Sequence, residues 1–506
     1  MKYFCVTGLC LPGRDYMCDI SSKVSQVAAM VERGNYFTIN RARQYGKTTV
    51  IRQLEKVLLE KGYQVARISF EGIGDTPFEN AKNFCQTLLR QISEALNCNG
   101  IKGYRTWINK SVSTFEKLDI HLNKVCKNKK IVLFIDETDK TSNNLVFLRF
   151  IGMLRDKYLE RGNPNKATFQ SVILAGVYDI KNLKLSSPWN IAADFNIDMS
   201  FNEKEIASML VDYENDYKTG MDINAISKEI RAYTSGYPYL VSRICQNIDE
   251  DLDRDWTTNG VQKAVRMILI EQSTLFDDLF KNVKSNSELR DLLYSILING
   301  KSFSFNSDNP GMELGLLFGI LAQKNEKIAI HNRIFEIRIT NYFATEREIS
   351  ESKLGMRTSV SSVVSENKLD MALLIEKFAK HYYEIYHHRD IDFLERECRL
   401  LFITFLRPFI NGVGFYHLES ETRDGERTDV IVDYNSEQFI VELKLWYGEA
   451  SHEKALDQLA GYLDSKNKDT GYLLTFDFRK ENNIGKPQAK WVEHKGKQIF
   501  DCMTGV

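Results

Sequence analysis

Three successive residues, Gly46, Lys47 and Thr48, carry the clearest chemical signal in this 506-residue chain. They lie between an apolar run of strand length, residues 35–40, and a stretch with apolar residues at helical spacing, residues 48–62. At such a strand-to-helix turn, backbone N–H groups and the helix N-terminus face an anion. The lysine reaches the β- and γ-phosphates, and the threonine hydroxyl ligates magnesium. The pattern predicts a site for a nucleoside triphosphate with Mg²⁺.

The loop departs from the usual pattern at its first position. The consensus G-x-x-x-x-G-K-[ST] has a glycine where this chain has Arg41. Because a Gly-Lys-Thr tripeptide also arises by chance after ordinary strands, the prediction needs a second motif. The candidate nucleotide-binding residues of the loop are Arg43, Gln44, Tyr45, Gly46, Lys47, Thr48 and Thr49.

Two carboxylates at the end of a buried apolar strand supply the second motif. Asp136 and Glu137 follow residues 131–135, where ionised side chains are costly unless they serve a cation or a water. We expect Asp136 to hold Mg²⁺ through its coordination shell, together with Thr48, and Glu137 to polarise the attacking water. A solvated strand end is the alternative for the two acids. Since both motifs occur in the right order and context, we predict ATP binding and hydrolysis.

A second group of acidic and basic residues lies near the C-terminus. Asp429 begins one strand-like run, and Glu442 and Lys444 lie on the next. Because side chains alternate along a strand, Glu442 and Lys444 point to the same face. Phosphodiester hydrolysis needs such a set: Asp429 and Glu442 would bind one or two Mg²⁺ ions, and Lys444 would orient the water or stabilise the transition state. The alternative is a half-buried strand with an exposed Glu-Lys pair.

Strand-like and helical stretches alternate around the first two motifs, which predicts an α/β fold with a parallel sheet covered by helices. Expected strands lie at 35–40, 63–70, 129–139 and 168–179, with a fifth candidate at 195–200. Expected helices lie at about 20–33, 48–62, 77–97, 104–127 and 143–160. From 202 to about 283 the pattern is helical, with a break at 234–243.

Later segments suggest further domains. Residues 285–345 mix helices with a strand-hairpin pattern at 327–339, which suits a small winged-helix-like unit, and the serine-rich segment 346–368 is the best linker candidate. Helices are expected at about 369–410 and 450–465, and strands at 414–422, 428–434, 438–446 and 471–478. The predicted organisation is a P-loop domain (1–200), a helical lid (201–284), the winged-helix-like unit (285–345), the linker (346–368) and a small α/β domain (369–506).

The composition excludes several classes of protein. With 43% hydrophobic and 27% charged residues, the chain is a folded multidomain protein and not a disordered one. The 67 Lys and Arg nearly balance the 68 Asp and Glu, so any nucleic-acid site must come from local patches. No run of about 18 apolar residues and no signal-peptide pattern is present, so we expect a cytoplasmic protein without membrane association.

Cysteines and histidines give weaker signals. The nine cysteines are scattered without a C-x-x-C pair, so reduced and mostly buried thiols are expected. Cys5, Cys10 and Cys18 are close enough in sequence to meet in space, but their spacing is poor for a metal site. The neighbours His387 and His388 lack a matching carboxylate pattern, and we expect them to be exposed or locally packed.

Residues 1–345 resemble the AAA-ATPase-like family of bacterial proteins, within the wider AAA+ class. The resemblance is carried by DYMCDIS (15–21), NYFTINRARQYGKTT (35–49), VLFIDETDK (132–140) and VILAGVYDIKNL (172–183). An arginine at the position of Arg41 is usual in that family. The resemblance implies a polar sensor residue after the fourth strand, Tyr178 or Asp179. It also implies a lid motif in GYPYLVSR, with Arg243 as a second sensor.

An arginine finger is a further possibility in this class. Arg149, Arg155 and Arg161 lie on or just past the helix that follows the second motif. One of them could reach a neighbouring subunit of a homo-oligomer. A solvated helix face is at least as good an interpretation.

Residues 370–480 resemble the PD-(D/E)XK nuclease superfamily. Asp429 matches its first acid, and Glu442-Leu443-Lys444 matches its E-x-K motif. The resemblance implies supporting residues on the flanking helices: Gln458 and Tyr462 for a Q-x-x-x-Y extension, and Glu397 or Glu395 for a preceding acid.

These features together predict an ATPase coupled to a Mg²⁺-dependent nuclease that acts on nucleic acid, with DNA favoured. Bacterial defence or DNA processing would suit such a protein, by analogy between families. One alternative is a regulatory switch or scaffold, in which the nucleotide state controls assembly and the C-terminal domain grips nucleic acid without cleaving it. Another is an ATPase whose C-terminal cluster is structural.

Overall fold

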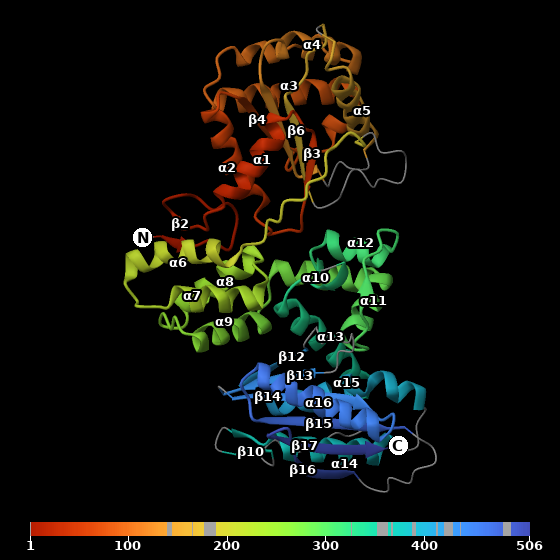
Figure 1. Cartoon of the computed structure of the whole chain (residues 1–506). Coiled ribbons are helices and arrows are strands. Elements are labelled where there is room, and N and C mark those ends of the chain that lie inside the picture. Colours follow the sequence, from red (N-terminus) through yellow and green to blue (C-terminus); the bar gives the residue numbers. More distant parts are fainter. Residues whose placement is uncertain are drawn as a thin grey trace. The chain divides into compact units, whose positions relative to one another are not determined.

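The computed structural model divides into two compact units, residues 1–261 with 317–319 and residues 262–316 with 320–506 (Figure 1). The structure describes residues 2–138, 144–163, 165–176, 189–324, 326–351, 363–365, 368–386, 391–410, 413–418, 429–435, 437–478 and 487–505. Within these ranges it describes all side chains except those of 348–351, 385, 386, 391–397 and 429. None of the described helices is both long and apolar enough to cross a membrane.

A four-stranded parallel sheet lies at the centre of the first unit. Its strands, in the spatial order β3-β6-β5-β4, are β3 (Phe37–Asn40), β6 (Ser171–Gly176), β5 (Ile131–Asp136) and β4 (Gln64–Ser69). Every residue of β5 and β6 is buried, as expected for parallel strands covered on both faces. The α/β class and these four strands are confirmed.

Five helices pack around this sheet: α1 (Ser21–Glu32), α2 (Lys47–Glu60), α3 (Ala81–Cys98), α4 (Phe115–Cys126) and α5 (Leu145–Leu159). Phe84 and Leu88 of α3, Leu122 of α4 and Phe147 of α5 join Leu133 of β5 in one core cluster. Two short 3-10 turns (Thr76–Phe78 and Tyr104–Trp107) and a two-stranded N-terminal pair, β1 (Tyr3–Phe4) with β2 (Asp15–Tyr16), complete this part.

The fifth strand predicted at 195–200 is wrong. Only Ala193 pairs with the sheet, in an isolated parallel bridge to Phe37. Asp and Asn residues, which are poor strand formers, interrupt the apolar pattern of this segment. The guanidinium of Arg41 also donates to the carbonyl oxygen of Ile197 at 3.0 Å, so this carbonyl is engaged by a side chain and not by a strand.

The helix predicted at 104–127 begins eleven residues late, at Phe115. Asn109 explains part of the delay, because its side-chain oxygen accepts hydrogen bonds from the N–H and hydroxyl of Ser111, at 3.0 and 2.7 Å. Such local bonds compete with helical ones. Thr114 then caps α4 by accepting from the N–H of Lys117.

Four helices follow the sheet: α6 (Glu203–Tyr217), α7 (Ile223–Thr234), α8 (Pro238–Glu250) and α9 (Thr258–Ile270). Asn202 and Glu205 form a capping box at the start of α6. The predicted break at 234–243 corresponds to the turn between α7 and α8, where Ser235 and Gly236 are left-handed. Pro238 then starts α8, a position where its missing N–H has no cost.

The second unit starts inside α9 and continues with a small antiparallel sheet and with helices α10 (Thr274–Ser285), α11 (Ser287–Leu297) and α12 (Pro310–Leu317). The strands of this sheet, in the order β7-β9-β8, are β7 (Phe303–Ser304), β9 (Lys327–Ile330) and β8 (Leu321–Lys324). The interpretation of residues 285–345 as a winged-helix-like unit stays a prediction.

The hairpin pattern predicted at 327–339 is right only for its first residues. Strand β9 ends at Ile330, and α13 (Arg333–Glu351) follows. Asn332 redirects the chain, because its side-chain oxygen accepts from the N–H of Phe335 at 2.9 Å, as a helix cap does. The predicted linker, 346–368, starts inside α13, and most of its other residues lie outside the described ranges.

The rest of the second unit is an α/β domain built on a six-stranded mixed sheet of order β12-β13-β14-β15-β17-β16. Its strands are β12 (Gly414–Leu418), β13 (Asp429–Tyr434), β14 (Glu437–Leu445), β15 (Thr470–Asp477), β16 (Gln488–His494) and β17 (Lys497–Gly505). Its helices are α14 (Met371–Tyr386), α15 (Ile391–Ile410) and α16 (Glu449–Ser465), and a short pair, β10 (Val364–Ser365) with β11 (Lys368–Leu369), precedes α14. Strands β16 and β17 were not predicted.

One face of this mixed sheet is covered by α16. Ala455, Leu459 and Leu463 of that helix form a core cluster with Ile440 of β14 and Leu473 of β15. Because side chains alternate along a strand, residues in step with Ile440 on β14 lie on this face. Glu442 and Lys444 therefore share the face that α16 covers.

Candidate functional site

The phosphate loop lies at the carboxyl end of β3, directly before α2. Gly46 is the N-cap of α2 and has φ 76°, a left-handed conformation that glycine adopts without strain. Gln44 in the same loop is also left-handed, with φ 57°. The first N–H groups of a helix have no partner within the helix and carry a partial positive charge. This turn is therefore built to receive an anion.

The ammonium group of Lys47 lies inside the loop. It donates hydrogen bonds to the main-chain oxygens of Arg41 at 2.7 Å and Ala42 at 3.0 Å, and the residue is buried. These neutral carbonyl oxygens occupy positions around the ammonium that phosphate oxygens can take. Charged acceptors bind an ammonium more strongly than neutral ones do.

Asp136 and Glu137 form the second half of the site, at the carboxyl end of β5. Asp136 is 6% exposed, and burial raises its pKa. Two other effects lower the pKa of Asp136: the hydrogen bond from the N–H of Glu137, at 3.0 Å, and the positive charge of Lys47. They do not cancel the effect of burial, so the pKa stays raised. Lys47 and Asp136, taken from the two separate motifs, therefore interact electrostatically.

The strand order explains how the two motifs meet. Strand β6 alone separates β3 from β5, so the two motifs lie two strand spacings apart, about 10 Å. Thr138, just past the second motif, donates from its hydroxyl to the oxygen of Ala175 in β6 at 3.2 Å. This bond ties the end of β5 to the intervening strand.

Glu137 has an unusual backbone conformation. Its φ is 55°, in the left-handed region that side chains other than glycine rarely adopt. Non-glycine residues held in this region often lie at functional sites, because the surrounding structure must hold them there. The conformation turns the chain sharply after the buried strand.

The start of α8 packs against the phosphate loop. The hydroxyl of Tyr237 donates to the main-chain oxygen of Arg43 at 2.7 Å, and its ring meets that of Tyr45 edge to face, with centroids 4.7 Å apart. A methyl group placed on Gly46 would lie 3.7 Å from the ring of Pro238. The predicted lid motif thus contacts the loop directly.

The other residues implied by the AAA+ resemblance have mixed outcomes. Arg243 donates to Gln246 on its own helix at 2.8 Å, and its role as a second sensor stays a prediction. Tyr178 and Asp179 lie outside the described residues, as do His387 and His388.

Among the three arginines, Arg161 is engaged within its own domain. It donates to the oxygens of Gly34 and Phe169 and stacks on Tyr158, with 4.3 Å from the guanidinium carbon to the ring centroid. Arg155 donates to Asn190 at 2.8 Å. Arg149 is exposed. Arg161 therefore has a structural role, and the identity of any arginine finger stays open.

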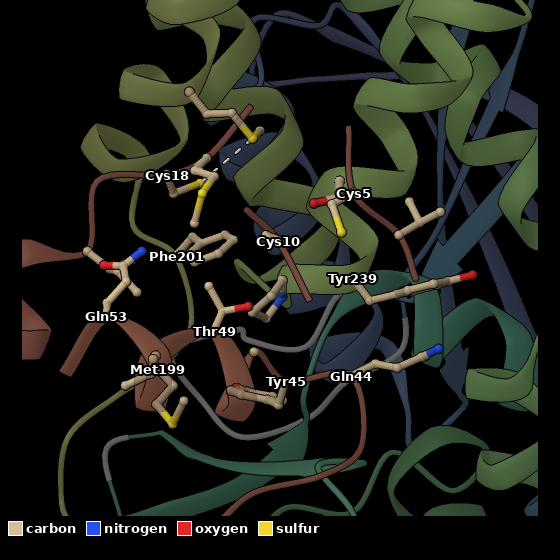
Figure 2. A pocket seen from close by; sticks show the side chains of 18 of the residues that line it. Cys5, Cys10, Cys18, Gln44, Tyr45, Thr49, Gln53, Met199, Phe201 and Tyr239 are labelled. Carbon is tan, nitrogen blue, oxygen red and sulfur yellow. Dashed lines mark hydrogen bonds between the residues drawn. The ribbon is translucent and has the colours of Figure 1, made fainter. Parts of the chain in front are cut away.

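A cavity of about 130 Å³ opens beside the loop (Figure 2). Four segments surround it: the N-terminal residues 5–23, the loop with the start of α2, residues 199–209, and the start of α8. Its walls are mostly apolar, with aromatic rings and sulfur atoms, and its labelled residues include Cys5, Cys10, Cys18, Gln44, Tyr45, Thr49, Gln53, Met199, Phe201 and Tyr239. The sequence predicted that the three cysteines could come close in space; they line one cavity, and its position beside the phosphate loop was not predicted.

In the second unit, Asp429 and Glu442 are direct partners across the antiparallel strands β13 and β14. Glu442 is 4% exposed, and Lys444 forms an ion pair with it at 3.3 Å. The structure describes the backbone of Asp429 but not its side chain, and the same holds for Glu395 and Glu397 on α15. The backbone register thus places the two predicted acids opposite each other.

Helix α16 carries the other two predicted residues, Gln458 and Tyr462. Both lie partly buried. The hydroxyl oxygen of Tyr462 is buried and has no hydrogen-bond partner among the described residues. A ligand or water that reached this hydroxyl would satisfy it.

A histidine–aspartate pair lies on the same face and was missed. Glu442 is in register with Leu473, and Leu473 with Asp501 on β17. Asp501 bonds to His452, in the first turn of α16, with 3.0 Å between Oδ2 and Nε2. Among the described residues, the other oxygen of Asp501 and the other ring nitrogen of His452 are buried without a partner. Only a prediction of β17 could have revealed this pair.

Comparison with known proteins identifies the family of the first unit and of the start of the second. The family model for the AAA-like domain matches residues 15–344. The chain belongs to this family. It therefore contains a P-loop ATPase-like domain, in agreement with the resemblance seen over residues 1–345.

Other similarities are more distant. An uncharacterized WD repeat-containing protein of Synechocystis sp. is 20% identical over 377 residues, which are 69% of this chain and 31% of that protein. The chain thus spans about a third of the curated relative that it matches.

Solved structures give weak matches. A Walker-type ATPase of Pyrococcus abyssi has TM-score 0.46 and 11% identity, over 66% of this chain and 99% of that one. The ORC2 protein of Aeropyrum pernix, in ADPNP–ADP complexes, has TM-score 0.38 and 11% identity, over 68% of this chain and 98% of that one. The RuvB branch migration motor of Thermotoga maritima has TM-score 0.32 and 13% identity, over 68% of this chain and 97% of that one. Matches at this level say nothing of the function of this chain.

Proposed function

We propose that the first unit binds ATP with Mg²⁺ and hydrolyses it. The observation that carries this proposal is the meeting of Gly46-capped helix α2, the buried Lys47 ammonium and the buried Asp136 carboxylate. The phosphates would lie at the N-terminus of α2. Lys47 would then exchange the carbonyl oxygens of Arg41 and Ala42 for oxygens of the β- and γ-phosphates, which are stronger acceptors.

The residues around this position also fit Mg²⁺. Thr48 and Asp136 offer the oxygen ligands that this ion prefers. Because burial raises the pKa of Asp136, a nearby cation would lower the free energy of its ionised form. When bound, Mg²⁺ would neutralise charge that develops on the phosphates. Glu137, in its left-handed conformation at the strand end, would orient and polarise the attacking water.

The cavity beside the loop fits the nucleobase. It adjoins Thr49, in the first turn of α2, and so begins where the phosphate site ends. Phe201 and Met199 offer flat and polarisable apolar surface for an aromatic base. Gln53 and Ser242 offer hydrogen-bonding groups that could distinguish one base from another.

Titration with a fluorescent ATP analogue and a phosphate-release assay test the proposal together. Lys47→Ala should lose nucleotide binding, and Glu137→Gln should bind but not hydrolyse. Lys56→Ala is the matched control, since Lys56 is an exposed lysine on the same helix α2. Equal binding by Lys47→Ala and Lys56→Ala would overturn the assignment of the loop.

For the second unit we propose Mg²⁺-dependent cleavage of nucleic acid, with DNA favoured. The register of Asp429 with Glu442 and the ion pair of Glu442 with Lys444 favour it. Asp429 and Glu442 would supply oxygen ligands for Mg²⁺, and the buried position of Glu442 makes a cation partner favourable. Lys444 would orient water or stabilise charge on the phosphate, with Gln458 and Tyr462 in support.

The competing proposal is a switch without cleavage. In it, the nucleotide state of the first unit controls assembly or partner binding, and the second unit binds nucleic acid only. Labelled single- and double-stranded DNA and RNA, incubated with and without Mg²⁺ and ATP, separate the two. Cleavage that requires Mg²⁺ supports the nuclease, whereas retarded but intact nucleic acid supports the switch.

A further inference from the structure

A groove of about 640 Å³ lies on the first unit, between helix α4 and the segment 106–112. Three lysines line it: Lys117 and Lys124 on α4, and Lys129 between α4 and β5. We call them the groove lysines. Among the described residues, none of those that line the groove is a glutamate or an aspartate. In a chain whose net charge is −1, the groove is therefore a local concentration of positive charge.

One face of α4 forms a wall of the groove. Lys117, Ile120 and Lys124 follow one another at intervals of three and four residues, so they lie on the same face of the helix. Lys117 and Lys124 are about 10 Å apart along the helix axis. Asp119 of the same helix is paired with Lys157 of α5 at 2.8 Å, which balances its charge away from the groove. Within the described part of the chain, no groove lysine forms an ion pair.

His121 fixes the facing segment to α4. The Nε2 atom of this side chain lies 3.2 Å from the main-chain oxygen of Trp107, which is fully buried. Burial lowers the pKa of His121, and the charge of Lys124 acts in the same direction. The ring is therefore neutral at pH 7, and its N–H donates to the Trp107 carbonyl. The two walls of the groove are thus held together before any ligand binds.

Apolar side chains also line the groove. Ile108 is 52% exposed and Ile120 is 68% exposed, whereas Val112 and Val125 are buried. Apolar surface beside lysines suits a ligand that carries both negative charge and apolar faces. A single nucleic-acid strand has both, because its phosphates are charged and its unpaired bases expose their faces. In a duplex these faces are covered by stacking and pairing.

We propose that this groove binds single-stranded nucleic acid, with the groove lysines on phosphates of one strand and the two exposed isoleucines against unpaired bases. The choice of nucleic acid over an acidic polypeptide rests on the nuclease proposed for the second unit. DNA and RNA strands share the phosphates and the unpaired bases that the groove recognises, and the test separates them.

The groove is distinct from the proposed ATP site. None of its lining residues belongs to the phosphate loop or lines the cavity beside that loop. Lys129 lies just before β5 begins, whereas Asp136 is the last residue of this strand. These two residues therefore lie at opposite edges of the sheet. Substitution of the groove lysines should leave ATP binding unchanged.

The test measures binding of a labelled DNA strand to the full-length protein by fluorescence polarisation, without Mg²⁺ so that Mg²⁺-dependent cleavage does not occur. The triple variant Lys117→Ala/Lys124→Ala/Lys129→Ala should bind the strand about tenfold more weakly at low salt. Each phosphate contact on a single strand contributes about 0.7 to the slope of log affinity against log salt concentration. Loss of three contacts should therefore make this slope shallower by about 2.

The matched control removes the same amount of charge from exposed lysines outside the groove, in the variant Lys56→Ala/Lys82→Ala/Lys228→Ala. This control should bind the strand as the unaltered protein does. Both variants should keep the thermal midpoint and the ATP turnover of the unaltered protein, which shows that the first unit is folded.

Two further measurements identify the ligand and its place. A strand with iodinated bases, cross-linked by light, should attach to peptides from residues 106–129. An RNA strand and a DNA duplex are titrated in parallel. Loss of affinity for the DNA strand, the RNA strand or both in the triple groove variant supports the groove, and the strand that loses more is its ligand. The duplex should bind more weakly and lose little.

Other results overturn the proposal. Equal losses in the groove variant and the control would show a general effect of charge, and unchanged affinity in the groove variant would exclude the groove. If the duplex loses as much affinity as the strand, the groove does not select single strands. If polyglutamate binds more tightly than the strand and loses affinity in the groove variant, the groove serves an acidic polypeptide.

The proposed nuclease is tested separately, by Mg²⁺-dependent cleavage in Asp429→Ala. If this variant stops cleavage while the groove variant binds the strand normally, the groove is wrong and the nuclease stands. If the groove variant loses the strand while Asp429→Ala cleaves normally, the groove stands and the nuclease assignment is wrong. If the unaltered protein neither binds nor cleaves nucleic acid, both proposals fail.

Discussion

The Tyr237 hydroxyl donates a 2.7 Å hydrogen bond to the main-chain oxygen of Arg43. Tyr237 is the N-cap of α8, and Arg43 belongs to the phosphate loop. Gly236, just before Tyr237, approaches Phe201 so closely that a methyl group on it would lie 1.9 Å from the Phe201 oxygen. The start of α8 is thus held between the loop on one side and Phe201 on the other. A nucleotide that changes the loop must therefore act on α8.

Tyr237→Phe tests this link, because it keeps the ring that packs on Tyr45 and removes only the hydroxyl. Loss of one such hydrogen bond costs about 1 kcal/mol, which corresponds to roughly fivefold weaker ATP binding if the loop must be ordered to bind. Titration with the fluorescent ATP analogue measures the change. Tyr217→Phe, at a partly buried position at the end of α6, serves as the control. Equal affinities for the two variants would show that this bond does not support the loop.

Glu137 offers a test in which stability and turnover change in opposite directions. Its left-handed backbone, φ 55°, costs a non-glycine residue about 1 kcal/mol. Glu137→Gly should therefore raise the thermal midpoint of the first unit while it stops ATP hydrolysis. Glu137→Gln keeps the strain, so it should stop hydrolysis at an unchanged midpoint. Thermal unfolding and phosphate release measure the two effects, and normal turnover by Glu137→Gln would contradict the role given to this residue.

The first unit was largely predictable because its signals are local. The buried strand before Asp136 is continuously apolar, and the helix after Lys47 has apolar residues at regular spacing. The strand prediction for 195–200 failed because the backbone of this segment is engaged by Arg41, a contact between residues 156 positions apart that no local pattern records. Asn332 misled the interpretation of 327–339 for a related reason, since its capping bond decides between strand and helix.

In the second unit, the register of Asp429 with Glu442 follows from a hairpin and could be expected from sequence. Strands β16 and β17 could not, since β16 is mostly exposed and has no continuous apolar face. The bond between His452 and Asp501 depends on β17 lying beside β15, which is a long-range pairing. Local periodicity fixes where strands begin and end but not which strands become neighbours.

Asp136 predicts a pH-dependent stability. Burial raises the pKa of its carboxyl in the folded protein above the ordinary value of 3.8, so the folded state holds this proton more tightly than the unfolded state does. The contribution of this carboxyl to the free energy of unfolding is greatest below the ordinary pKa of the unfolded state. It is lost as the pH rises through the raised pKa of the folded state. Asp136→Asn, which cannot ionise, should therefore be more stable than the unaltered protein near neutral pH without nucleotide.

Two comparisons complete this test. The advantage of Asp136→Asn should vanish at about pH 3 and below, roughly one pH unit under the ordinary pKa of an aspartate, where the unaltered carboxyl is mostly protonated in both states. Addition of Mg²⁺ and ATP should raise the thermal midpoint of the unaltered protein but not that of Asp136→Asn, because a ligand stabilises only the state that binds it. An Asn variant that is less stable at neutral pH without ligand would show that Asp136 is stabilising as a charge, contrary to the effect of its burial.

Lys444 gives the sharpest test of the second unit. Lys444→Ala removes the ion pair with Glu442 and the charge proposed to act at the scissile phosphate, and Asp429→Ala removes one proposed Mg²⁺ ligand. Each should lower Mg²⁺-dependent cleavage by about a hundredfold or more, and neither should change ATP turnover in the first unit. Lys454→Ala changes an exposed lysine of α16. It controls for a general loss of positive charge, and this variant should cleave normally.

Because Lys444→Ala leaves Glu442 buried without its partner, thermal unfolding of each variant must show that the domain still folds. Cleavage that persists in both folded variants would exclude this cluster as the nuclease site.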